Sequence, residues 1–233
     1  MEQEQAIKTN EQNTGKQPKT RVRPVRVKGL RDKPSQLRTT LTRVVWLSIA
    51  LGLVMEAFLV AARLGAFTMD AATAELVNRV SWSVLVCTGL AIGDTLAENS
   101  RPLLLGLSGL LGAPLAFAVA RGLHKGTADL MNIAQPADPI SPLLAGGIRG
   151  VEYMILGLAI FWLKKQPRST VLSYIGVGLV IGLVFGSLIM FLNPGVTKSL
   201  SSILVWVVNE VAFPVGCTLV LFASTAIGKK VEV

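Results

Sequence analysis

The chain has little charge, only two cysteines and a single histidine. Charged residues make up 16% of its 233 residues, whereas soluble domains carry about 25%. The low charge excludes a soluble globular enzyme, and the two cysteines exclude a disulfide-stapled scaffold. What is abundant is apolar: 51% of the residues are hydrophobic and the mean hydropathy is +0.55. This composition predicts an integral membrane protein.

Motifs of common catalytic and metal sites are also missing. The one histidine, His124, cannot supply an HExxH motif or a clustered zinc site. There is no GxxxxGK[ST] phosphate loop, and neither Ser108 nor Ser187 stands in a GxSxG pattern. Cys87 and Cys217 form no CxxC pair, so we interpret them as small apolar packing residues. We therefore expect no enzyme activity, no metal and no cofactor, with an intramembrane serine or aspartyl enzyme as a third alternative.

Residues 1–42 differ in composition from the rest of the chain. They are rich in Gln, Thr, Lys, Arg and Pro and contain no apolar run, which predicts a disordered tail. Within it, Thr20–Arg31 alternates cations with valine, and such a juxtamembrane segment is attracted to anionic lipid by about 1 kcal/mol per basic residue. The alternative is a docking site for a protein or a nucleic acid. Of these two partners, we do not expect a nucleic acid. The predicted lipid-binding residues are Arg21, Arg23, Arg26, Lys28 and Arg31.

Six apolar segments are long enough to cross a membrane, which takes about 20 residues. The first follows a long polar segment and exceeds the apolar region of a signal peptide, about 7–15 residues, so we interpret it as a retained helix. We therefore predict an all-α integral membrane protein in which residues 43–228 form a compact six-helix transmembrane bundle. The predicted spans lie near residues 44–66, 80–97, 103–123, 143–163, 170–192 and 203–226.

The distribution of lysine and arginine predicts the orientation, because cytoplasmic loops carry the excess of these residues. With the amino terminus inside, the inner segments hold 17 of the 23 basic residues and the outer loops hold three. Both termini, including residues 229–233, are therefore predicted to be cytoplasmic. The small size and simple organisation favour a bacterial-type inner membrane.

Small residues spaced four apart predict close packing between helices, because they let backbones approach. A repeated pattern also suggests a 3+3 inverted repeat. The sequence GLAIG at 89–93 recurs as GLVIG at 178–182, and Glu56 of the first span aligns with Glu152 of the fourth. The alternative is a chance match between apolar segments. The small-residue spacing occurs at Gly89 and Gly93, at Gly146 and Gly150, and at Gly178, Gly182 and Gly186.

Several ionisable residues lie within the predicted spans, where an unpaired charge is costly and usually functional. Arg149 and Glu152 are three residues apart, which places them on one helix face within pairing distance. Arg63 and Arg121 lie nearer the span ends, where arginine can reach the interface. We expect the set to converge on one polar cavity, and the alternative is a structural network that only fixes helix register. The candidate substrate or ion site is Glu56, Arg149, Glu152, Asn209 and Glu210.

Two further acids, Asp94 and Glu98, lie four residues apart near the predicted cytoplasmic end of the second span. They would repel one another unless a cation or Arg101 lay between them. We expect either a solvated pair at the level of the headgroups or a cytoplasmic mouth that binds a cation.

These features predict a small polytopic transporter or channel for an ion or a small polar solute. Glu56, Glu152 and Glu210 would carry a proton or bind a cation, and Arg149 would tune their pKa values or bind an anionic group. The alternative is a non-catalytic subunit or scaffold of a larger membrane complex. Its interfaces would be the basic tail and the glycine faces, and its partner a second copy of the chain or another membrane protein.

Overall fold

The computed structural model describes residues 33–63, 68–97, 102–134, 140–192 and 199–231, and residues 35–233 form one compact unit. Within the described ranges the chain is helical and contains no strand. Six helices are long and apolar enough to cross a membrane, which supports a polytopic membrane protein. The predicted lipid-binding residues of the tail, and Glu98 and Arg101, lie outside the described ranges.

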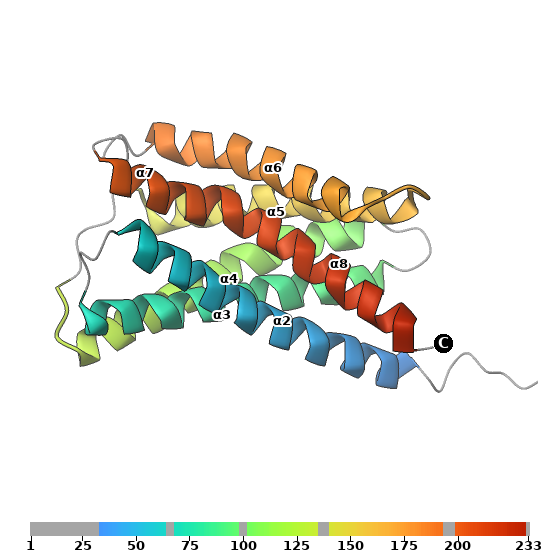
Figure 1. Cartoon of the computed structure of the whole chain (residues 1–233), viewed down its shortest axis with the longest axis horizontal. Helices are drawn as coiled ribbons and strands as arrows, with labels where there is room; N and C mark the ends of the chain where they lie inside the picture. Colours follow the sequence, from blue (N-terminus) through green and yellow to red (C-terminus); the bar gives the residue numbers. More distant parts are fainter. Residues whose placement is uncertain (1–32, 64–67, 98–101, 135–139, 193–198, 232–233) are drawn as a thin grey trace, which may run out of the picture. The chain divides into compact units, whose positions relative to one another are not determined.

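Five long helices precede a composite sixth span. The last span is continuous from Leu200 to Ile227 and includes a short π-helical segment, η2. Figure 1 shows α6 lying along this composite span. The helices are α2 (Lys33–Ala62), α3 (Met69–Leu96), α4 (Pro102–Leu130), α5 (Pro142–Lys165), α6 (Val171–Leu192), α7 (Leu200–Trp206), η2 (Val207–Ala212) and α8 (Phe213–Val231).

Contacts between the helices define the order of the bundle. α4 lies between α3 and α5, while α6 packs against η2 and α8. Contacts of α5 with α6, and of α3 with α8, join these two groups. The 3+3 inverted repeat stays a prediction.

α2 packs against both α3 and α8. The Ser83 hydroxyl on α3 donates a hydrogen bond of 2.7 Å to the carbonyl oxygen of Ser48 on α2. The two backbones approach so closely at Gly52 that a Cβ there would lie 2.7 Å from the α3 backbone. Leu51, the residue before Gly52, contacts α8 at Gly216. α2 begins at Lys33, so the last ten residues of the predicted tail are helical.

α3 and α4 extend further than the predicted spans. α3 begins at Met69, after Thr68, whose hydroxyl oxygen accepts a first-turn hydrogen bond of 3.3 Å, and α4 continues to Leu130. Arg79 and Lys125 are two of the three basic residues assigned to outer loops, since they lie just outside the predicted spans 80–97 and 103–123, but both lie within helices. The added turns carry charged side chains that face a cavity inside the bundle, so apolar length alone underestimates these helices.

A stripe of three glycines on α6 lies directly against the composite span. A Cβ added at Gly178 would lie 2.6 Å from the Cα atom of Val215. At Gly182 it would lie 2.8 Å from the carbonyl oxygen of Glu210, and at Gly186 it would lie 2.8 Å from the Cβ atom of Glu210. Because these glycines have no side chains, α6 approaches η2 closely and fixes the position of Glu210.

We expect Gly182→Ala to lower the thermal unfolding midpoint of the purified protein in detergent. The added methyl group has no room between α6 and η2, and overpacking of this kind costs about 1–3 kcal/mol. Gly176→Ala on the same helix is the control, because its added Cβ meets no atom within 4 Å. Equal midpoints for the two variants would contradict the close contact.

Candidate functional site

Arg149 on α5 bridges two buried carboxylates. Its Nη1 atom donates a hydrogen bond of 2.7 Å to Oε2 of Glu152, and its Nη2 atom donates one of 2.6 Å to Oε1 of Glu210. Glu152 is fully buried, Glu210 is 8% exposed and the Arg149 side chain is 14% exposed. The spacing of three residues predicts the first contact, while the second joins α5 to η2. We call these three residues the Arg149 triad.

Close contacts between α4 and α5 position Arg149. A Cβ at Gly150 would lie 2.8 Å from the carbonyl oxygen of Leu110 on α4. A Cβ at Gly109 on α4 would clash with the carbonyl oxygen of Tyr153 on α5. α5 therefore has little freedom to rotate against α4, and the direction of the Arg149 side chain follows.

Pro214 accounts for the local geometry around Glu210. A proline inside a helix has no N–H to bond the carbonyl four residues earlier, and here that carbonyl belongs to Glu210. The preceding segment, Val207–Ala212, is π-helical, a rare conformation that is frequent at functional sites. It presents Asn209 and Glu210 to a cavity between α3, α4, α5 and the composite span.

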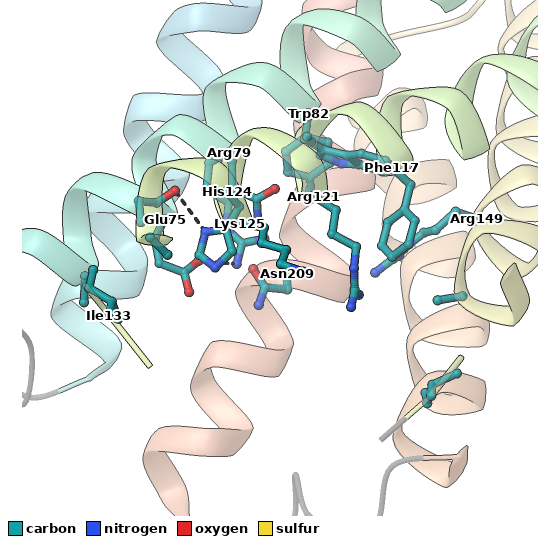
Figure 2. Close-up of a pocket in the computed structure, with 18 of the residues that line it drawn as sticks. Glu75, Arg79, Trp82, Phe117, Arg121, His124, Lys125, Ile133, Arg149 and Asn209 are labelled. Atoms are coloured by element: carbon teal, nitrogen blue, oxygen red, sulfur yellow. Dashed lines mark hydrogen bonds and ion pairs between the residues drawn. The ribbon is translucent and has the colours of Figure 1, made fainter. Parts of the chain in front are cut away.

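A cavity of about 510 Å³ lies beside the Arg149 triad, between α3, α4, α5 and the composite span (Figure 2). We call it the central pocket. Its polar walls include Asn78, His124 and Asn209, and its aromatic walls are Trp82, Phe117 and Phe213. Its charged lining residues are Glu75, Arg79, Arg121, Lys125, Arg149 and Glu210.

A second set of ion pairs stands on the α3 side of the central pocket. Glu75 is held by two arginines: its Oε1 lies 3.2 Å from Nη2 of Arg63, and its Oε2 lies 3.1 Å from Nη2 of Arg79. Arg63, which sequence analysis places near the membrane interface, therefore joins α2 to α3. Nearby, Nδ1 of His124 lies 3.1 Å from the carbonyl oxygen of Ala74.

Glu56 lies apart from the triad. It is buried on α2 at 7% exposure, and neither carboxylate oxygen accepts a hydrogen bond from the part of the chain that the structure describes. It does not line the central pocket, although it lies within electrostatic range of Glu75, Arg79 and Arg63. Of the five predicted site residues, the structure thus brings together Arg149, Glu152 and Glu210, with Asn209 on the same pocket and Glu56 outside it.

Asp94 forms an ion pair with Lys164, which joins α3 to α5. The sequence offers Arg101 or a bound cation as the partner of Asp94, but the partner is a lysine 70 residues away. A cytoplasmic mouth at this point stays a prediction.

The two cysteines and the acidic side chains were the remaining candidates for redox or metal chemistry. The thiols of Cys87 on α3 and Cys217 on α8 are buried and lie 3.5 Å apart. No group of three or more His, Cys, Asp or Glu side chains is placed to hold a metal ion within the ranges that the structure describes.

Several pocket residues escape a search based on hydropathy. Glu75, Arg79 and Trp82 recur at intervals of three and four residues, as one face of α3 requires, and Phe117 and Arg121 do so on α4. Helical periodicity over residues 69–82 would have indicated this face. A search by mean hydropathy misses this face, because its charged side chains lower the mean hydropathy at the end of the span.

No family model, no curated protein and no solved structure matches this chain. The function is therefore inferred from the chemistry of the site itself.

We expect Arg149→Gln to destabilise the bundle strongly, because Glu152 and Glu210 would lose their shared counter-charge. Breaking a buried ion pair by removing one partner costs about 3–5 kcal/mol. Glu152→Gln should cost less, since its amide oxygen can still accept the hydrogen bond from Arg149.

Thermal unfolding in one detergent measures both variants against wild type. Arg168→Gln is the control, because Arg168 is exposed in the connection that follows α5. An Arg149→Gln midpoint equal to that of the control would show that the triad contributes nothing to stability.

Proposed function

We propose that the chain is a small membrane transporter that moves a small polar solute together with a proton. The observation that supports this most is that Arg149 and Glu210 belong both to the triad and to the wall of the central pocket. The Arg149 triad, which is suited to exchange a proton, and the central pocket, which is suited to hold a solute, therefore share these two side chains. On the predicted orientation, with both termini cytoplasmic in a bacterial-type inner membrane, the pocket lies toward the outer side.

The charge of the triad supports a proton site. With all three groups ionised, two carboxylates and one guanidinium carry a net charge of −1. Binding one proton would make the triad neutral, and a neutral group is far easier to hold at membrane depth. Oε1 of Glu152 accepts no hydrogen bond from the described residues, so it is an atom at which the proton could reside, whereas Oε2 of Glu210 lies 2.6 Å from Nη2 of Arg149.

Arg149 would link the proton to the solute. Protonation of Glu152 would weaken its ion pair with Arg149 and free the guanidinium to turn, together with Glu210, toward a solute in the central pocket. Departure of the solute would restore the ion pair. The segment that carries Glu210 is suited to such movement, because η2 and Pro214 interrupt the regular helical hydrogen bonds there.

The alternative function is a non-catalytic subunit of a membrane complex, in which the triad is a structural network. The central pocket favours the transporter, because a network that only fixes helix register does not require a cavity. A second copy of the chain, or another membrane protein, would be the partner under this alternative.

Proton movement driven by solute in proteoliposomes tests the proposal. The full chain is reconstituted into vesicles that contain a pH-sensitive dye, and benzenesulfonate, benzyltrimethylammonium and glucose are added in turn as an anionic, a cationic and a neutral solute. We expect at least one solute to change the internal pH in wild-type vesicles. Glu152→Gln should abolish this change, because its amide cannot carry a proton.

Arg168→Gln vesicles serve as the control and should behave as wild type. Vesicles in which none of the three solutes changes the internal pH beyond that of protein-free vesicles would overturn the transporter proposal. A protein that co-purifies in fixed stoichiometry would then favour the subunit.

A further inference from the structure

We infer that the central pocket binds a small organic anion, one that carries a single acidic group on an apolar body. The inference rests on the proposed function and specifies its substrate class. The sequence alone predicts a proton or a cation at the intramembrane carboxylates, and it offers Arg149 either as a group that tunes their pKa values or as a binder of an anionic group.

The charge of the lining favours an anion over a cation. Four cationic side chains and two carboxylates line the central pocket, which leaves an excess of two positive charges. Arg63 and Glu152 pair with lining residues from behind and cancel one another, so the excess is unchanged when they are included. Even with the buried Glu56 added, the balance remains positive.

The two carboxylates in the lining are already engaged by arginine. Glu75 lies between Arg63 and Arg79, and Glu210 accepts a hydrogen bond from Arg149. A cationic solute would have to displace these arginines. An anionic solute would instead meet an excess of guanidinium and ammonium groups, whose donors match carboxylate, sulfonate or phosphate oxygens.

Arg121 and Lys125 are the residues we assign to the anionic group. They lie four residues apart on α4, and both line the central pocket. Arg149 reaches the same pocket from α5, as Figure 2 shows. Basic side chains from two helices therefore line one space, an arrangement suited to the recognition of a compact anion.

The aromatic wall accounts for the apolar body of the solute. Trp82 packs edge to face against Phe117, with ring centroids 6.2 Å apart, and its ring lies 6.1 Å from that of Phe213. Alanines make up much of the remaining lining. A volume of about 510 Å³ falls within the usual range for small-molecule sites, and an inorganic ion would leave most of it empty.

A second cavity supports an amphipathic solute. It has a volume of about 670 Å³, lies between α4 and α5, and is lined mainly by proline, glycine, leucine and alanine. It shares Phe117, Arg121 and Lys125 with the central pocket. The same basic side chains thus stand between an apolar groove and the pocket, where they could guide the anionic group inward.

Isothermal titration of the full chain in detergent tests this inference. The probes are methanesulfonate, benzenesulfonate and naphthalenesulfonate, with benzenesulfonamide as the neutral analogue and benzyltrimethylammonium as the cationic one. We expect benzenesulfonate to bind more tightly than either analogue, and the affinity of the sulfonates to rise with the apolar body. Arg121→Gln and Lys125→Gln should each weaken sulfonate binding about 10-fold, as expected for a hydrogen bond to a charged group.

Arg168→Gln is the control for charge, because it removes a cation at the opposite end of α5. Unfolding midpoints show whether each variant is folded. Equal affinity for benzenesulfonate and benzenesulfonamide, or sulfonate binding that survives the Arg121→Gln/Lys125→Gln double substitution in folded protein, would overturn the inference.

Comparison with the vesicle experiment separates the two proposals. Proton movement driven only by benzyltrimethylammonium or glucose, with no preference for sulfonates in the titration, would contradict the anion site and leave the transporter in place. Sulfonate binding that depends on Arg121 and Lys125, without any proton movement, would support the anion site and contradict the transporter.

Discussion

The buried guanidinium of Arg149 is the interaction on which the arrangement of the bundle depends. A charge at this depth requires counter-charges, and one of them, Glu210, comes from the composite span. Three packing features place Glu210 within reach. The α6 glycine stripe holds η2 close to α6, Pro214 disrupts the regular helix at Glu210, and the α4 contact at Gly150 fixes the face of α5 that carries Arg149.

A cavity next to such a network reduces packing in the bundle. Protein interiors are normally close-packed, and empty volume lowers stability through lost contacts. The apolar core elsewhere in the bundle, by contrast, is closely packed, and its members Leu105, Leu156 and Ile160 are fully buried. A structural network would be more stable with its charges packed tightly, so a charged cavity retained beside the Arg149 triad favours a functional purpose for both.

Local patterns predict the helices and one of the decisive contacts. Apolar length gives six spans, and the spacing of Arg149 and Glu152 gives their pairing, because both depend on residues near in sequence. The contact with Glu210 crosses 61 residues, and that between Asp94 and Lys164 crosses 70, so each depends on how helices are arranged. No local pattern specifies such partners.

The pocket residues are a different case. Glu75 and Arg79 shorten the predicted second span because they lower its hydropathy, yet in the bundle they face a cavity and one another rather than lipid. Position within an amphipathic helix, rather than composition, decides their environment.

The proton and anion proposals support one another through charge. An anion bound alone would carry its charge across the membrane, and the potential contributes about 2.3 kcal/mol per charge for each 100 mV. An anion of charge −1 that moves with one proton carries no net charge. Under these proposals the two tasks are separate in space, because Arg121 and Lys125 on α4 line the pocket, whereas Glu152 pairs with Arg149 outside the lining. Because Arg149 contacts both the pocket and the carboxylates, occupancy by the anion and protonation of Glu152 would each favour the other.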